Sequence, residues 1–176
     1  MSYRFLTCAA LLLSAAAFSS GQPKSPPAET SVTINGKAIS IKYAAPSVRG
    51  RKIFGDGGLV SKDPTYPVWR AGANSATSLH TDADLEINGT AVPKGDYTVF
   101  ALVKDDPWQL IINKQTKQWG LSYNGAMDLL RAPMTMSKPA ALVETYKMTL
   151  SDAGNGRAKL QMEFENTIAS IVFKVK

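Results

Sequence analysis

Residues 31–43, SVTINGKAISIKY, decide the fold class of this 176-residue chain. On both sides of the dipeptide of Asn35 and Gly36, apolar side chains alternate with polar ones, which is the period of a strand with one buried face. An Asn-Gly pair between two such runs favours a two-residue turn, because both positions need positive φ angles. The stretch therefore predicts a β-hairpin whose apolar face turns toward a core.

The same alternation returns along the rest of the chain. It is clearest in residues 76–87, 97–103, 108–112, 130–136, 146–150, 158–164 and 171–175. Both faces of residues 97–103 are apolar, which indicates a central strand, whereas Pro133 indicates an edge strand. No segment predicts a helix of more than two turns. Short alternating strands at regular spacing predict an all-β fold, a single antiparallel β-sandwich of roughly eight to ten strands over residues 31–176.

The first twenty residues have the layout of a secretory signal peptide. Arg4 precedes an apolar run over residues 6–18, and small residues follow it. Because the run is too short to span a bilayer, we expect cleavage between Ala17 and Gln22, with an uncleaved N-terminal anchor as the alternative. The protein would then be periplasmic or secreted and have no membrane span after cleavage. Residues 21–30 contain three prolines and are expected to form a flexible linker.

The composition narrows the chemistry further. The only cysteine, Cys8, lies in the predicted signal peptide, so the mature chain would have neither disulfides nor a catalytic thiol. The net charge of the whole chain is +6, and its lysines are spread along the sequence. A solvated surface explains this charge as well as an anionic partner does, and export makes nucleic acid an unexpected partner.

Groups suited to catalysis are scarce. His80 is the only histidine, and strand alternation places it on a polar face with Ser78 and Asp82, so we expect it to face solvent. There is no nucleophile-elbow motif, and a zinc ion would have no second histidine and no thiol as ligand. Glu163 and Glu165 share one polar strand face and are expected to be solvated. No catalytic residue, metal site or cofactor is predicted.

Residues 46–77 contain the candidate binding site. Arg51 and Arg70 offer planar forks of donors that match a carboxylate or phosphate. Trp69 offers a flat face for a sugar or another ring, and Asn74 adds a donor and an acceptor. Arg51, Trp69, Arg70 and Asn74 are therefore predicted to bind a glycan or a small anionic ligand. In the alternative interpretation, Trp69 fills the core and an arginine braces the loop; alternation would place Trp69 and Arg70 on opposite strand faces.

Several motifs of the chain carry a family resemblance. They are PSV at residues 46–48, GR at 50–51, IFG at 53–55, LV at 59–60, WRAGAN at 69–74, AT at 76–77, PKGDY at 93–97, Asn113, QWG at 118–120, Tyr123 and DLLR at 128–131. Through these motifs the sequence resembles the bacterial family called domain of unknown function 2911, over nearly all of the chain after the signal segment. The resemblance implies an exported single-domain protein with no established activity, and it names no ligand. The chain departs from the family pattern at residues 61–66, so the resemblance does not specify the shape of the loop there. It also departs at His80, which argues against a shared histidine catalyst.

The leading hypothesis is an exported bacterial β-sandwich that binds a glycan or small anion without catalysis. One alternative is a hydrolase whose carboxylates come from separate strands, for instance Asp56 or Asp82 together with a glutamate. The other is a structural or assembly protein of the cell envelope, in which the arginine loop is a brace. The sequence specifies no oligomeric state.

Overall fold

The computed structural model describes residues 25–104 and 106–176. The predicted signal peptide, its cleavage range and the first part of the linker lie outside these residues. The described part contains β1 (Pro27–Ile34), β2 (Lys37–Ala44), η1 (Val60–Lys62), β3 (Val68–Trp69), β4 (Thr77–Thr81), β5 (Leu85–Ile87), β6 (Thr90–Val92), β7 (Gly95–Leu102), β8 (Gln109–Asn113), η2 (Gly125–Met127), β9 (Asp128–Pro133), β10 (Thr135–Ser137), β11 (Val143–Gly154), β12 (Arg157–Glu165) and β13 (Thr167–Val175). η1 and η2 are short 3-10 turns, so the expectation of no longer helix is confirmed for this part of the chain.

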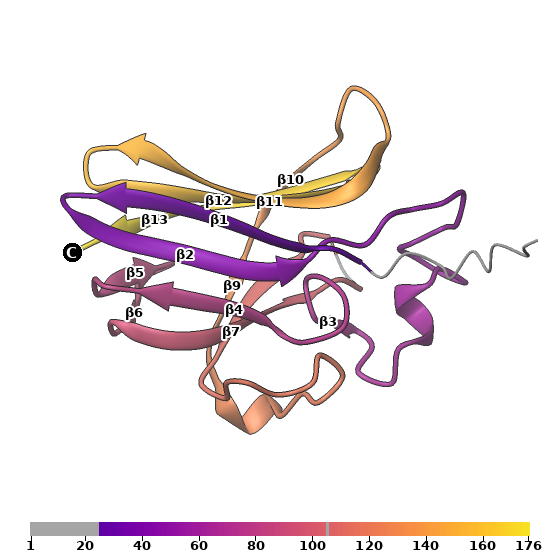
Figure 1. Ribbon diagram of the computed structural model, residues 1–176, viewed down its shortest axis with the longest axis horizontal. Helices are drawn as coiled ribbons and strands as arrows, with labels where there is room; N and C mark the ends of the chain where they lie inside the picture. Colours follow the sequence, from indigo (N-terminus) through magenta and orange to yellow (C-terminus); the bar gives the residue numbers. More distant parts are fainter. Residues whose placement is uncertain (1–24, 105) are drawn as a thin grey trace, which may run out of the picture.

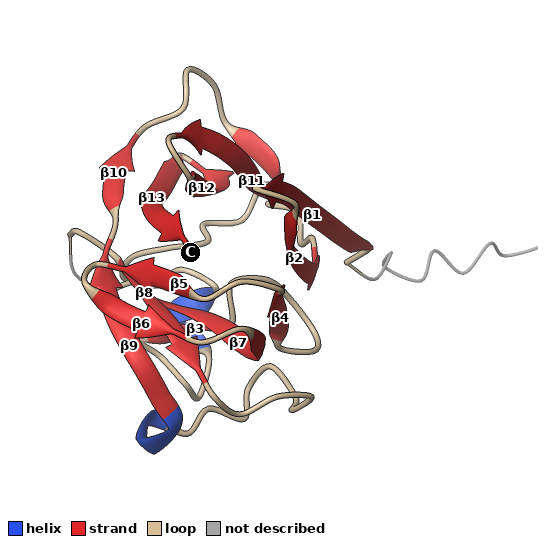
Figure 2. Ribbon diagram, turned by 90° about the vertical axis from the view of Figure 1, so that its left-hand side faces the viewer, coloured by secondary structure: helices blue, strands red, loops and turns tan. Residues whose placement is uncertain are grey.

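The strands form two antiparallel sheets packed face to face, which confirms the predicted β-sandwich (Figures 1 and 2). The seven-stranded sheet has the order β1-β2-β4-β7-β8-β9, with β3 pairing to β7. The six-stranded sheet has the order β11-β12-β13-β5-β6, with β10 pairing to β13. The structure has 13 described strands instead of the expected eight to ten. β3 and β6, of two and three residues, are too short to show a period in the sequence, and the run over residues 130–136 forms two strands, β9 and β10.

The hairpin forms as the sequence predicts, but it begins earlier. Asn35 and Gly36 have φ angles of 51° and 74°, as a two-residue turn of this type requires. β1 starts at Pro27, so the expectation of a flexible linker through residue 30 is wrong for its last four residues. They are held because the pairing with β2 continues to this end, where Pro27 lies opposite Ala44.

The predicted strand over residues 130–136 is divided between the two sheets. β9 is the last strand of the seven-stranded sheet, and β10 pairs only with β13 in the other, so both lie at edges as Pro133 indicates. The single strand expected here is wrong, because the chain crosses from one sheet to the other at Met134, whose amide donates to the Trp108 carbonyl at 2.8 Å.

β7 is the central strand expected from its two apolar faces. Tyr97, Val99 and Ala101 turn into the core between the sheets. On the outer face, Phe100 packs with Val68 and Ile111. The loop after β8 covers this smaller cluster, and the Tyr123 ring centroid lies 5.0 Å from that of Phe100. The seven-stranded sheet therefore has a covered part and an open part on its outer face.

Candidate functional site

The loop between β2 and β3 closes one end of the sandwich. Its backbone pairs with β11 through Val48, whose amide donates to the Glu144 carbonyl, and Pro46, whose carbonyl accepts from Tyr146. The Glu165 carboxylate at the end of β12 accepts from the Ile53 amide at 3.0 Å. A loop that belongs to one sheet is thus fastened to the other.

Arg51 takes part in this fastening. Its Nε donates to the Val48 carbonyl at 3.0 Å and its Nη2 to the Ser47 carbonyl at 2.7 Å. The guanidinium therefore holds the turn of the loop, although the side chain is largely exposed. For Arg51, these contacts agree with the alternative interpretation, in which an arginine braces the loop.

Trp69 lies in the core and is only 2% exposed. Its ring packs edge-on against Tyr146 and Phe54, with centroids 4.9 and 5.2 Å away, and stacks on Phe164 at 6.3 Å. Trp108 completes the cluster at 6.2 Å. Because other rings cover its faces, Trp69 offers no surface on which a sugar could stack.

Arg51, Trp69 and Arg70 nevertheless line one pocket of about 140 Å³, called here the arginine pocket, together with Asp63. Trp69 and Arg70 share it because β3 ends at Trp69, so the strand alternation expected to separate them does not continue. Asn74 lies outside this pocket. It lines a neighbouring hollow of about 350 Å³ with Lys42.

The charges in the arginine pocket are incompletely paired. The side chains of Arg70 and Asp63 are 17% and 19% exposed, and Arg70 Nη2 lies 3.5 Å from Asp63 Oδ2, beyond a good hydrogen-bond distance. Arg70 Nε is buried and has no hydrogen-bond partner among the described residues. Because buried polar groups are nearly always satisfied, an unpaired guanidinium nitrogen is a signal of a missing acceptor.

Gly120 lies close against the Arg70 side chain. A Cβ at this position would lie 2.5 Å from Arg70 Cδ and 2.4 Å from the Asn74 carbonyl oxygen. Only glycine lets the chain after β8 approach so closely. The Gly120 amide donates to that same carbonyl at 3.1 Å.

A second polar cluster lies under the loop after β8 and was not among the predicted site residues. Asn113 is fully buried and donates to Asp128 Oδ1 at 2.8 Å. Tyr123 OH donates to Asp128 Oδ2, which also accepts from Arg131 Nε at 2.9 Å. Burial and the Asp128 carboxylate raise the pKa of Tyr123 to about 12. Tyr123 therefore remains a donor at neutral pH, and the cluster anchors the loop. The only signal in the sequence was that these residues belong to the family motifs.

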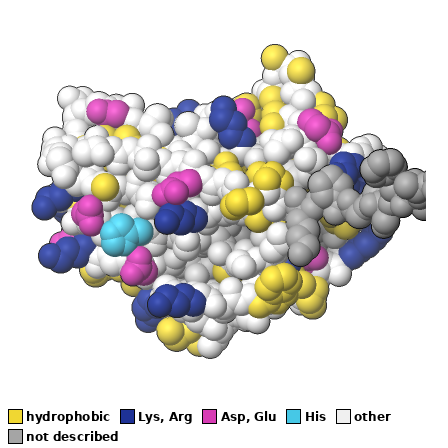
Figure 3. Space-filling model, viewed as in Figure 1, with side chains coloured by type: hydrophobic (Ala, Val, Ile, Leu, Met, Phe, Trp, Pro, Cys, Tyr) yellow, Lys and Arg dark blue, Asp and Glu magenta, His cyan; other side chains and the backbone are white. Residues whose placement is uncertain are grey.

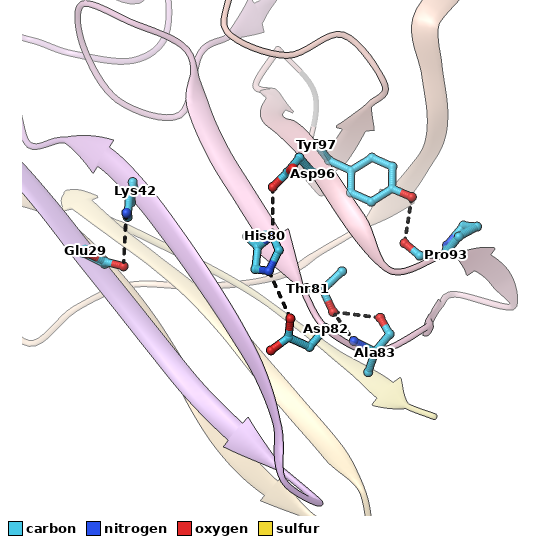
Figure 4. A network of polar contacts seen from close by, with 9 residues as sticks. All are labelled: Glu29, Lys42, His80, Thr81, Asp82, Ala83, Pro93, Asp96 and Tyr97. Carbon is cyan, nitrogen blue, oxygen red and sulfur yellow. Dashed lines mark hydrogen bonds and ion pairs between the residues drawn. The ribbon is translucent and has the colours of Figure 1, made fainter.

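His80 faces solvent, as expected, with its side chain 51% exposed (Figure 4). Its Nδ1 lies 2.8 Å from Asp96 Oδ1, and its Nε2 lies 3.1 Å from Asp82 Oδ1. Because carboxylates occupy both ring nitrogens, neither is bonded to a serine hydroxyl as a catalytic triad requires.

The two carboxylates beside His80 favour the protonated form of its imidazole. The hydrogen bond to Asp96, and next that to Asp82, raise the pKa of His80 above 6.5. A pKa that is raised by folding gives stability that is present below about pH 6.5 and is lost as the pH rises through the folded value. NMR titration of the imidazole protons should show a raised pKa that falls toward 6.5 in Asp96→Asn. An equal pKa in both proteins would contradict the contact.

Other catalytic and metal arrangements find little support among the described residues. They contain no group of three or more His, Cys, Asp or Glu that could hold a metal ion. The arginine pocket holds one acid, Asp63, so it lacks the pair of carboxylates that a glycosidase needs. Asp56 is exposed and Asp82 bonds His80. Glu165 is partly buried, not solvated as expected, because its carboxylate accepts a hydrogen bond from the loop.

The helices of the described residues, η1 and η2, have three residues each, so none of them could span a membrane.

Comparison with known proteins agrees with the resemblance seen in the sequence motifs. The model of a family described as protein of unknown function (DUF2911) matches residues 25–173. No curated protein and no solved structure matches the chain.

Proposed function

This chain belongs to the DUF2911 family of proteins of unknown function, and we propose that it is an exported, non-catalytic binding module for a small anionic ligand held in the arginine pocket. The observation that carries the proposal is the buried Arg70 Nε, which has no acceptor among the described residues. A carboxylate or phosphate group would supply that acceptor and bind the guanidinium fork side-on.

Size and shape favour a small anion over a sugar. The pocket measures about 140 Å³, and the faces of Trp69 are covered by other rings. Asp63 lies in the same pocket and competes with a ligand for Arg70, yet at 3.5 Å it satisfies the guanidinium poorly. A compact anion that displaces this weak pairing fits the charges better than a neutral ring does.

The competing interpretation is that the arginines are braces. It explains Arg51, which bonds two loop carbonyls. It does not explain Arg70, whose ion pair is long and whose Nε is unpaired. A brace would be expected to satisfy a guanidinium that is mostly buried.

Isothermal titration calorimetry of the purified protein with formate, acetate and phosphate tests the proposal. Arg70→Met should weaken saturable binding about 10- to 100-fold, because a charge-assisted hydrogen bond contributes roughly 1.5–3 kcal/mol. Asp63→Asn should strengthen it, since it removes the competing carboxylate. Arg157→Met, at an exposed arginine outside the pocket, is the matched control and should change nothing.

Two results would count against anion binding at Arg70. One is the absence of saturable binding for all three anions. The other is a loss of roughly 3–5 kcal/mol of stability in Arg70→Ala without any anion effect, the pattern of a broken buried pair. The second result would mean that Arg70 braces the loop and does not bind a ligand.

The proposal of export is supported by the N-terminal sequence, in which Arg4 precedes an apolar run and small residues. The protein recovered from the periplasm or the medium should begin between Ala17 and Gln22, as its intact mass would show. A cytoplasmic chain that retains Met1 would contradict export.

A further inference from the structure

The open part of the seven-stranded sheet carries a groove that lies beside the arginine pocket. Three hollows of about 350, 490 and 300 Å³ lie over β2, β4 and β7. They adjoin, because Ser78 on β4 lines all three. We call this continuous depression the Ser78 groove. It includes none of Arg51, Asp63, Trp69 and Arg70, although its hollow of about 350 Å³ adjoins the arginine pocket, because Ser25 and Ala73 line both.

The groove is lined by many uncharged hydrogen-bonding groups and a few charges of both signs. Ser40, Ser75, Ser78, Thr98, Thr116 and Gln118 supply hydroxyl and amide groups. Lys42 and Asp96 are opposite charges in the same hollow. Figure 3 views this face, on which acidic and basic side chains surround the single histidine in cyan. Such a surface suits a ligand with many hydroxyls better than a polyanion, which needs a row of cations.

Gln118 adds an unpaired donor to the groove. Its Nε2 is buried and has no hydrogen-bond partner among the described residues. Its Oε1 lies 3.4 Å from the Thr98 hydroxyl, which itself donates to the Gln115 carbonyl at 2.8 Å. Because buried amide groups are normally satisfied, this nitrogen requires an acceptor from a ligand or an ordered water.

Trp119 lines none of the three hollows itself, but it is paired with Ser75, which lines two of them. It is 55% exposed, the largest exposed fraction among the exposed large hydrophobic residues of the described chain. Trp119 and Ser75 form an isolated antiparallel bridge. The flanking bonds run from Gly120 to the Asn74 carbonyl and from Ala76 to the Gln118 carbonyl, so the pair between them is the non-hydrogen-bonded type. The two side chains therefore lie close together on one face, and Ser75 lines both hollows.

We propose that the Ser78 groove binds a carbohydrate chain, one of whose rings stacks on Trp119. A sugar ring has an apolar face that an exposed indole can cover, and hydroxyls that serine, threonine and glutamine side chains can bond. The site is independent of the anion proposal, since it uses neither Arg70 nor Asp63.

Maltohexaose, cellohexaose and chitohexaose are suitable probes, because they are neutral and differ in linkage and in substituents. With the purified protein, saturation-transfer NMR should detect at least one of them, and the tryptophan fluorescence should change with the same midpoint. Trp119→Ala should weaken this binding at least about tenfold, whereas Trp119→Phe should retain part of it. Leu142→Ala, which shortens an exposed apolar residue away from the groove, is the matched control.

Several results would overturn the proposal. They are no binding of any of the three hexasaccharides, binding that Trp119→Ala and Gln118→Ala leave unchanged, and saturable binding only to a single-stranded oligonucleotide. Binding to the hexasaccharide should survive Arg70→Met, and binding of small anions should survive Trp119→Ala. This pair of variants separates a failure of the groove proposal from a failure of the anion site.

Discussion

Replacing Trp69 with alanine should lower the free energy of unfolding by about 3–5 kcal/mol. Trp69 is 2% exposed, and the rings of Phe54, Tyr146 and Phe164 pack around it. The substitution removes an indole from the centre of this cluster. The rings cannot all close the cavity, because they come from the loop after β2 and from the opposite sheet, whose backbones are fixed by pairing. Urea unfolding followed by circular dichroism measures the loss.

Trp119→Ala provides the control within the same protein and with the same change of side chain. Trp119 is 55% exposed, so about half of its surface is already in water. We expect a loss of only about 1–2 kcal/mol. Equal losses in the two variants would mean that the aromatic cluster is not the centre of the core that the packing indicates.

The hairpin of β1 and β2 could be predicted from the sequence because local chemistry determines it. Asn35 and Gly36 set the turn, and each apolar residue beside them has only one face to occupy. The two faces of β7 were equally readable, since Val99 and Phe100 point to opposite sides of one strand. The hydrophobic period and the turn residues are local properties of the sequence, and they were sufficient to predict the fold class.

The crossing at Met134 could not be read in the same way. The apolar period continues through residues 130–136, and nothing in it tells which sheet each half joins. The sheet that each half joins depends on tertiary contacts, because β9 pairs with β8 and β10 pairs with β13. A period of two specifies a buried face but not the sheet that provides it.

The two tryptophans show why the site was harder to predict than the fold. Trp69 and Trp119 both lie beside loops in which no period assigns a face. Contacts with distant residues decide that the first is in the core and the second in water. The prediction brought Arg51, Trp69 and Arg70 together because they are close in sequence, but Asn74 faces another hollow. Gln118 meets Ala76, and Trp119 meets Ser75, only through long-range pairing.

The polar cluster under the loop after β8 gives the second large expected effect. Asn113→Asp should destabilise the protein by about 3–5 kcal/mol at neutral pH. Asn113 is completely buried, and its Nδ2 donates to Asp128 Oδ1 at 2.8 Å and to the Asn124 carbonyl at 2.9 Å. The substitution keeps the shape of the side chain but places an acceptor against these two acceptors and a second carboxylate against Asp128.

The penalty should depend on pH, and its sign follows from the protonation of the introduced carboxyl. Burial and the Asp128 charge raise the pKa of the new group in the folded protein above the unfolded value near 4. The penalty is therefore full above the folded pKa and shrinks as the pH falls toward 4, because a protonated carboxyl again donates one hydrogen bond. The urea unfolding midpoints of the parent protein and of Asn113→Asp, compared from pH 7 down to about pH 4, would show whether the stability difference becomes smaller.

Asn88→Asp makes the same chemical change in the exposed turn between β5 and β6, where aspartate tolerates the φ angle of 49°. Its stability should stay within about 0.5 kcal/mol of the parent protein at every pH. If Asn113→Asp behaved like Asn88→Asp, the loop after β8 would not depend on its buried cluster. A pH-dependent loss confined to Asn113→Asp would instead show that the loop bearing Gln118 and Trp119 is held to β8 and β9 by Asn113 and Asp128. The loop residues that line the Ser78 groove, Thr116, Lys117 and Gln118, would then depend on that anchor for their position.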